Sequence, residues 1–364
     1  MKMEAKKTRF TNDLLQWHRT QNFRQMPWKG EKDPYRVWLS EVILQQTRVD
    51  QGRAYYEKFV TVFPTIHDLA VAPEQQVFKL WEGLGYYTRC RNLIATAKTI
   101  DRDFNGRFPS TYREILALKG IGPYTAAAIA SFAFDLPHAV VDGNVLRVLA
   151  RFFGITAPID TRAGRSSLEE LAMELLDVRQ ASAYNQAIMD FGATVCTPRS
   201  PHCDACIHQS ACTAWKESLV GRLPVKEKIP QRKRRFLYYF FVEMPGGKVY
   251  IRQRSGKDIW KGLHEFVLIE TADQMGSDDL LRSDEVRQLF DGQPLTARHI
   301  SKVYSQALTH QTVQGQFIAM RFDKPPTALR NYFLIPKAGL ASYAFPKFIN
   351  KWLLAAEQQK FIFS

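Results

Sequence analysis

The sequence predicts a two-domain protein, in which an all-α domain is followed by a domain of the α+β class. The chain has 364 residues, and single hydrophobic cores usually stop growing before this length, so two cores are expected. Apolar residues recur near the helical period up to about Trp215, whereas later segments are rich in β-branched and aromatic residues. The basic stretch KEKIPQRKRR (226–235) separates the two patterns and is expected to be a linker.

Individual elements follow from local periodicity and from the glycines and prolines between them. Helices are predicted at 11–20, 34–60, 74–85 and 165–178 in the first part, and at 345–359 near the end. Strands are predicted at 235–244, 247–254, 263–270 and 313–322. Gly246 and Gly247 lie between the first two of these strands and indicate a hairpin.

The charge balance favours a polyanionic partner. Fifty basic residues face 36 acidic ones, for a net charge of +14, which suits nucleic acid or an anionic membrane surface, although a merely soluble basic protein would look the same. The opening MKMEAKKTRF lacks the apolar core of a signal peptide, and no stretch approaches the roughly 20 apolar residues that cross a bilayer. A cytoplasmic protein without a targeting signal is expected.

Four of the five cysteines are bunched with the spacing C-x6-C-x2-C-x5-C, at Cys196, Cys203, Cys206 and Cys212. This spacing predicts a metal site and not a disulfide framework. It does not distinguish zinc from an iron–sulfur cluster. His202 and His208 flank the thiols as spare ligands, but a solvated role is expected for each.

The stretch LKGIGPYTAAAIASFAF (118–134) begins with Gly120 and Gly122 in a tight hairpin and continues as a small-residue helix. Glycines there let backbone N–H groups and a helix N-terminus approach a phosphate, which would make the hairpin a DNA anchor. An ordinary helix–turn–helix packed by alanines fits the same glycine spacing.

Two carboxylates stand out as candidates for acid–base chemistry. Glu41 lies in VWLSEVILQ, a helix apolar nearly all round, where lost hydration would raise its pKa and keep it protonated; alternatively it reaches solvent at the helix edge. Asp142 directly precedes a helix, where Asp is a preferred N-cap. Its carboxylate could also project into a cleft and stabilise a cationic sugar, as cleavage through an oxocarbenium-like transition state requires.

Together, SEVILQQTRVD, EGLGYYTRCRNL, LKGIGPYTA, VDGNVLRVLAR and the four-cysteine segment resemble the helix–hairpin–helix DNA glycosylases, and specifically the MutY-type adenine DNA glycosylases. The resemblance covers nearly the whole first domain. It implies that the four cysteines hold a [4Fe-4S] cluster, that Glu41 protonates adenine at N7, and that Asp142, with Asn144 beside it, stabilises the oxocarbenium ion. Tyr124 stands where bifunctional relatives such as endonuclease III carry a Schiff-base lysine, so hydrolysis without strand cleavage is implied.

The resemblance also implies residues that bind DNA and the flipped base. Gln46 and Tyr86 resemble the side chains inserted into the duplex, and Thr47 is a further candidate DNA contact. The candidate adenine pocket consists of Arg24, Trp28, Leu44 and Gln186.

From about Phe236 onward the chain resembles the family's Nudix-like domain, which reads 8-oxoguanine. The acidic REUxEE box is missing, so recognition without phosphohydrolysis is implied. Leu308, Thr309 and His310 stand where the family often has Phe-Ser-His. The expected organisation is a glycosylase domain at 1–220 with the cluster loop at 196–212, a basic linker at 221–235, and the Nudix-like domain at 236–364.

The expected protein is a monomer that binds double-stranded DNA containing A:8-oxoguanine or A:G mispairs and is associated with the bacterial nucleoid. Two alternatives are an endonuclease III-like glycosylase and lyase, against which Tyr124 and the second domain speak, and a non-catalytic, cluster-bearing DNA-binding or redox-sensing protein. The presence of both Glu41 and Asp142 in their motifs argues against the second.

Overall fold

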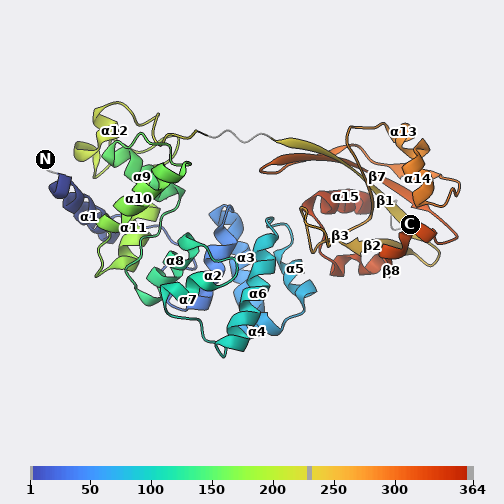
Figure 1. The fold of residues 1–364 in the computed structure, drawn as a ribbon, viewed down its shortest axis with the longest axis horizontal. Coiled ribbons are helices and arrows are strands. Elements are labelled where there is room, and N and C mark those ends of the chain that lie inside the picture. The colour runs from blue at the N-terminus through green and yellow to red at the C-terminus, as the bar shows by residue number, and fades with distance from the viewer. Residues whose placement is uncertain (1–2, 228–231, 359–364) are drawn as a thin grey trace. The chain divides into compact units, whose positions relative to one another are not determined.

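The chain divides into two compact units in the computed structural model, which describes residues 3–227 and 232–358 (Figure 1). The first unit is formed by Met1–Val71 and Asn92–Lys228, and the second by Ala72–Arg91 and Ile229–Ser364. No helix in the described ranges is long and apolar enough to span a bilayer.

The described part of the first unit is helical, which confirms the predicted all-α character. Its elements are α1 (Met3–Thr20), α2 (Pro34–Leu44), α3 (Val49–Val62), α4 (Ile66–Val71), most of α6 (Thr88–Asp103), α7 (Tyr112–Ala117), α8 (Pro123–Phe134), α9 (Gly143–Phe153), α10 (Arg162–Leu175), α11 (Ala181–Thr194), η1 (Gln209–Ala211) and α12 (Thr213–Lys216).

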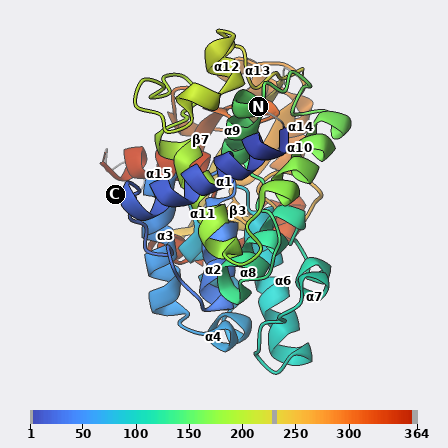
Figure 2. The same cartoon turned by 90° about the vertical axis from the view of Figure 1, so that its left-hand side faces the viewer.

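Two sets of contacts organise this unit. In Figure 2, α1 crosses in front of α10 and α11 and packs on both, and α9 joins them around a core that includes Phe10, Leu149 and Phe191. Elsewhere α2 packs against α3 and α8. Since α8 also contacts α11, the helix that carries Glu41 is linked to this core through α8.

The long helix predicted over 34–60 is in fact two helices, α2 and α3, with a break at residues 45–48. Asp33 caps α2 by accepting a hydrogen bond from Tyr35 N, and Pro34 occupies its first turn. In the break, Gln46 has a φ of +56°, a left-handed conformation that residues other than glycine rarely adopt. Residues 45–48 (QQTR) contain neither glycine nor proline, so no breaker residue marks the end of α2 in the sequence.

The second unit contains α5 (Glu74–Trp81) and a mixed sheet. Its strands are β1 (Lys233–Met244), β2 (Lys248–Gln253), β3 (His264–Glu265), β4 (Val267–Thr271), β5 (Ala297–Ile300), β6 (Tyr304–Ala307), β7 (Gln311–Arg321) and β8 (Phe333–Pro336). Its other helical elements are α13 (Ser277–Arg282), α14 (Asp284–Leu289), η2 (Thr327–Asn331), η3 (Lys337–Ser342) and α15 (Lys347–Gln358). Strands and helices together agree with the predicted α+β class.

Strand β1 is the centre of this sheet and is buried on both faces. It runs parallel to β7 and antiparallel to β2 and β4. Tyr238 and Phe240 point into a core that includes residues of α13 and α14, while Phe241 contacts Trp352 of α15 on the other face. Because side chains of a strand alternate between faces, this one strand contributes to both cores.

Sequence and structure differ at two places near this strand. The chain enters β1 at Lys233, inside the stretch 226–235 expected to be a linker, and residues 228–231 of that stretch lie outside the described part. The single strand predicted over 263–270 is divided at Phe266 into β3 and β4. The hairpin at Gly246 and Gly247 is confirmed, with φ values of +77° and +66°.

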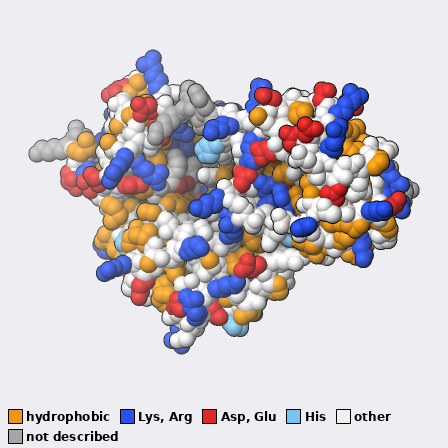
Figure 3. Space-filling model, turned by 45° about the vertical axis from the view of Figure 1, so that its right-hand side comes forward, with side chains coloured by type: hydrophobic (Ala, Val, Ile, Leu, Met, Phe, Trp, Pro, Cys, Tyr) orange, Lys and Arg blue, Asp and Glu red, His pale blue; other side chains and the backbone are white. Residues whose placement is uncertain are grey.

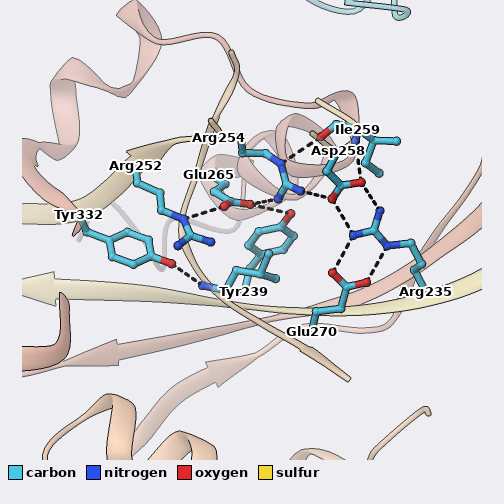
Figure 4. Close-up of polar contacts among 10 residues, drawn as sticks. Arg235, Tyr239, Arg252, Arg254, Asp258, Ile259, Glu265, Glu270 and Tyr332 are labelled. Atoms are coloured by element: carbon cyan, nitrogen blue, oxygen red, sulfur yellow. Dashed lines mark hydrogen bonds and ion pairs between the residues drawn. The ribbon is translucent and has the colours of Figure 1, made fainter. Parts of the chain in front are cut away.

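A network of ion pairs ties β1 and β2 to the loop that follows β2 (Figure 4). Glu265 is 1% exposed and accepts hydrogen bonds from Arg254 Nη1 and from Arg252 Nε, the latter at 2.8 Å. Arg235 is hydrogen bonded to both Asp258 and Glu270. Since each charge in the network faces an opposite one, its role is structural: it fixes the 254–265 segment on the sheet.

Candidate active site

Glu41 lies in the second half of α2 and is 7% exposed, so its carboxyl does not reach solvent at the helix edge. Burial raises its pKa to about 7, the Tyr124 hydroxyl opposes this rise by donating a hydrogen bond, and the nearby charge of Asp142 adds to it. A carboxyl with this pKa is protonated in a large fraction of molecules near neutral pH. It is therefore suited to act as a general acid.

Tyr124 follows Pro123 in the first turn of α8, directly after the glycine hairpin. The ring is partly exposed, but its hydroxyl is enclosed. Burial raises the pKa of this phenol well above its ordinary value, and the charges of Glu41 and Asp142 raise it further. The hydroxyl therefore stays protonated and serves as a donor to Glu41.

Asp142 is the N-cap of α9, as its position before the helix predicted. One carboxylate oxygen accepts from Asn144 N and Val145 N, both at 2.8 Å, and the other accepts from Asn144 Nδ2 at 2.7 Å. Burial raises the pKa of Asp142, while these hydrogen bonds and the charge of Arg147 oppose the rise. Asp142 therefore has two roles. It caps α9, and the cap holds its carboxylate close enough to Glu41 and Tyr124 to affect the pKa of each.

Arg147 connects this carboxylate to the cysteine segment. Its Nη2 donates to Asn144 Oδ1 at 2.8 Å and to Gly192 O at 2.6 Å, and its Nε donates to Cys196 O at 2.7 Å. A Cβ at Gly192 would lie 2.7 Å from Asn144 Cβ, so the glycine is required for this close approach of α11 to α9. Sequence reasoning missed Arg147. The available signal was an arginine at a position of α9 where the helical period predicts a buried apolar residue.

The four predicted cysteines follow α11, and each remains a free thiol. Burial raises the pKa of the Cys206 thiol, and the charges of Cys196, Cys212 and Cys203 raise it further. Arg151 Nη1 lies 3.5 Å from Cys196 Sγ. In the described ranges no set of three or more His, Cys, Asp or Glu side chains has the geometry of a metal-ion site.

The expectation that His208 is solvated is wrong. The side chain is 2% exposed and stacks on Phe10 with ring centroids 4.6 Å apart. Burial lowers its pKa to about 3, so the imidazole is neutral and behaves as an aromatic core residue. His202, by contrast, is exposed as expected.

The glycine hairpin is supported from α6. Gly120 has a φ of +78°, and a Cβ there would lie 2.4 Å from Asn92 Nδ2. Thr96 Oγ1 donates to Lys119 O at 2.7 Å, and Gly122 is the N-cap of α8. Gly120 thus has both a conformational and a steric reason to be glycine. The hairpin presents the α8 N-terminus as the sequence predicted.

The candidate pocket residues lie on three elements of the first unit. Arg24 Nη1 donates to Asp190 Oδ1 of α11 at 2.8 Å, and Lys29 Nζ lies 3.1 Å from the other oxygen of the same fully buried carboxylate. Trp28 packs edge-on against Tyr56 with ring centroids 5.3 Å apart. Leu44 ends α2 and Gln186 is half-buried on α11. Asp190 was missed because its partners are over 160 residues away in sequence.

The two candidate inserted residues are exposed and conformationally unusual. Gln46 and Tyr86 have φ values of +56° and +49°, and Thr47 N donates to Leu44 O to close the turn after α2. Tyr86 lies in the second unit, where its hydroxyl is 2.7 Å from Thr309 Oγ1.

Leu308, Thr309 and His310 form the loop between β6 and β7. Leu308 N donates to Gln311 O at 2.7 Å, and His310 O accepts from Lys233 N. Thr309 and His310 are exposed, whereas Leu308 is half-buried.

Comparison with known proteins decides the family. Residues 39–174, which include Glu41, Tyr124 and Asp142, match the HhH-GPD superfamily of base excision DNA repair proteins. Adenine DNA glycosylase of Buchnera aphidicola subsp. Baizongia pistaciae is 36% identical over 261 residues, which are 71% of this chain and 73% of that protein. The chain belongs to the adenine DNA glycosylase family.

Further similarities agree with this family. Human adenine DNA glycosylase is 41% identical over 219 residues, which are 58% of this chain and 40% of that protein. The structure of a thermostable thymine-DNA glycosylase matches with a TM-score of 0.55 and 29% identity, covering 60% of this chain and 100% of that one. Endonuclease III in a non-covalent DNA complex matches with a TM-score of 0.51 and 20% identity, over 60% of this chain and 99% of that one, which supports the fold alone.

Proposed function

We propose that this chain is a monofunctional base-excision enzyme, which hydrolyses the N-glycosidic bond of adenine paired with 8-oxoguanine and, more weakly, with guanine. The observation that carries the proposal is the pairing of two unlike carboxyls. Glu41 is buried with a pKa raised to about 7, and Asp142 is held by three hydrogen bonds beside it. An acid and an ionised carboxylate are the groups that N-glycoside cleavage needs.

The reaction begins with the adenine outside the duplex, because a stacked base cannot reach these buried groups. Glu41 gives its proton to N7, the bond between C1′ and N9 breaks, and its electron pair passes to the base, which leaves as neutral adenine. Asp142 stabilises the cationic sugar. Ionised Glu41 then takes a proton from the water whose oxygen bonds to C1′.

Tyr124 supports the monofunctional part of the proposal. Strand cleavage by a lyase route needs an amine that forms an imine with the sugar, and a phenol cannot form one. Tyr124 instead donates to Glu41, which places a hydroxyl where bifunctional relatives are expected to carry a lysine.

Cys196, Cys203, Cys206 and Cys212 are proposed to hold a [4Fe-4S] cluster. Four cysteines in one short segment suit four-thiolate ligation. Arg147 and Arg151 hold this segment, and Cys196 and Cys212 both contact Arg151, which supports the proposal. When bound, the cluster would link the loop after α11 into one rigid segment. Arg147 hydrogen bonds both Cys196 O and Asn144, so the position of that segment bears on Asp142.

The part of the second unit that corresponds to the expected domain 236–364, with β1 beginning slightly earlier at Lys233, is proposed to be Nudix-like and to read 8-oxoguanine through Leu308, Thr309 and His310. The part of the first unit within 1–220 is proposed to be the glycosylase domain. The position of these residues in one loop between paired strands supports this role. Thr309 and His310 are exposed, and the Thr309 hydroxyl lies 2.7 Å from the hydroxyl of Tyr86, so both side chains lie at the surface where a lesion could be contacted.

The proposed partner is duplex DNA with an A:8-oxoguanine or A:G pair, bound by a monomer. Figure 3 shows Lys and Arg side chains spread over the drawn face among acidic and apolar ones, and the net charge is +14. Binding should therefore weaken steeply with salt.

One assay tests the proposal. The protein is incubated with a duplex that contains a single A opposite 8-oxoguanine, and the products are compared with and without hot alkali. Strand breaks only after alkali support monofunctional excision, whereas breaks without alkali indicate an endonuclease III-like lyase. If no abasic site forms, the proposed enzymatic function is refuted and the alternative of a non-catalytic DNA-binding protein is favoured. Glu41→Gln should abolish base loss while leaving DNA binding intact.

A further inference from the structure

The turn that carries Tyr86 is strained and exposes an aromatic ring. Tyr86 has a φ of +49°, an uncommon conformation for a bulky residue, and the glycines before it, Gly83 and Gly85, have φ values of +89° and +82°. The Tyr86 side chain is 46% exposed. A strained backbone persists only where its surroundings hold it in place, and such sites often serve function.

Arg89 is the residue that holds this turn. It lies in the first turn of α6 and is only 8% exposed. Its Nη2 donates to Gly85 O at 3.3 Å, a carbonyl that also accepts from Trp81 Nε1 at 3.0 Å. Its backbone N donates to Tyr86 O at 2.8 Å. Arg89 therefore fixes the two carbonyls that flank the Tyr86 backbone, Gly85 O before it and Tyr86 O after it.

The same guanidinium also contacts two aromatic rings. Arg89 Cζ is 5.2 Å from the ring centroid of Trp81, which is fully buried, and 5.4 Å from that of Tyr86. Both distances are within the range of cation–π interactions. Buried Trp81 thus supports Arg89, and Arg89 supports the exposed ring of Tyr86.

We propose that Arg89 is a positioning residue for Tyr86, which holds the ring in a fixed orientation for insertion into the gap left by the extruded adenosine. This inference rests on the proposed function, in which Tyr86 enters the duplex. A planar guanidinium can stack on a ring and donate to Gly85 O at the same time, whereas a lysine ammonium can satisfy only one of these contacts. Preorganising the ring lowers the ordering cost of insertion.

A double-mutant cycle tests the proposal in the full-length protein. The variants are Arg89→Lys, Tyr86→Ala and their combination, and the readout is the fluorescence of 2-aminopurine placed opposite 8-oxoguanine, which reports base extrusion. Arg89→Lys should reduce extrusion about five- to tenfold, on the scale of one buried cation–π contact. In the Tyr86→Ala background the same substitution should have no further effect, since Arg89 acts through Tyr86.

A purely structural role gives a different result. If Arg89 only stabilises the fold, Arg89→Lys will cause the same loss with and without Tyr86, together with a lower melting temperature, and the proposal is then overturned. Unchanged extrusion in Arg89→Lys also overturns it. Should Arg89→Lys fold poorly, Arg89→Met, which keeps the apolar stem, is carried through the same cycle with the same expected and overturning results.

Arg91→Lys is the matched control. This arginine lies on the same helix, and its guanidinium donates to Lys261 O and Thr88 Oγ1. Its substitution should leave extrusion unchanged. The extrusion signal does not require base cleavage, so a protein that extrudes 2-aminopurine without releasing adenine would refute the proposed function and still test Arg89.

Discussion

The Tyr124 hydroxyl donates a hydrogen bond to the Glu41 carboxyl, and this contact limits the rise that burial causes, which leaves the pKa of Glu41 at about 7. The pKa of Glu41 is therefore set by two opposing effects: burial of its carboxyl raises it, and the hydrogen bond from Tyr124 of α8 lowers it. The apolar residues around Glu41 indicate the first effect, whereas nothing in the local sequence indicates the hydrogen bond from Tyr124.

Replacing Tyr124 by Phe removes the hydrogen bond while keeping the ring. The pKa of Glu41 should rise, because the contact that stabilises its ionised form is lost. Since the acid must be protonated, the wild-type rate of adenine release should fall as pH increases through about 7, and in Tyr124→Phe this decline should move to higher pH. Single-turnover rates between about pH 6 and 9 would measure it. An unchanged pH profile would mean that Glu41 is not the titrating group.

Glu41 should also make stability depend on pH. Its pKa is about 7 in the folded chain, against an ordinary value of 4.5, so the folded state binds more protons than the unfolded state between these values. The free energy of unfolding should therefore decrease as pH rises from 4.5 to 7. Glu41→Gln should remove this penalty and be more stable at pH 8 by up to about 3 kcal/mol.

Urea unfolding at pH 5 and pH 8 checks this prediction. Glu169→Gln is a suitable control, because the Glu169 side chain is 45% exposed and pairs with Arg165 of α10. Equal pH dependence in wild type and Glu41→Gln would show that the buried carboxyl does not carry the effect.

Arg147 should be needed for catalysis without contacting the substrate. It fixes Asn144, which in turn hydrogen bonds Asp142. Arg147→Met should lower the single-turnover rate by about 10- to 100-fold, comparable to the loss of an outer partner of a functional ligand. Visible absorbance of the purified variant would report whether the proposed cluster is retained. If Arg147→Met loses both its rate and that absorbance, and preparations that keep the absorbance keep the rate, Arg147 acts through cluster binding alone.

Asp190 should be critical for stability because it is fully buried between two cations. Asp190→Asn leaves Arg24 and Lys29 without a balancing charge and should reduce the free energy of unfolding by about 3 kcal/mol. Adding Lys29→Met should recover part of the loss, since one uncompensated cation is removed. Denaturant unfolding of the single and double variants provides the measurement, and strictly additive losses would argue against charge balance as the cause.

Much of the fold could be predicted from local patterns. Several helices of the first unit, the N-cap at Asp142, the glycine hairpin and the strands near β1, β2, β4 and β7 follow from periodicity and capping rules, whereas α4, α6, α7, α11, β5, β6 and β8 were not predicted. The break at residues 45–48 and the burial of His208 could not, because both depend on side chains from distant helices. Arg89 was also missed, since a lone arginine in a polar motif carries no sign of stacking.

The sequence by itself indicated the all-α and α+β parts of the fold, the grouping of four cysteines and the candidate carboxylates Glu41 and Asp142, but not that Ala72–Arg91 belongs to the second unit. Only the tertiary structure decided that Glu41 is enclosed, that Tyr124 donates to it, and that Arg147 connects Asp142 to the cysteine segment. The physical reason is the range of the interactions. Periodicity and capping act within a few residues, whereas desolvation and buried hydrogen bonds depend on groups that the packing of α2, α8, α9 and α11 brings together.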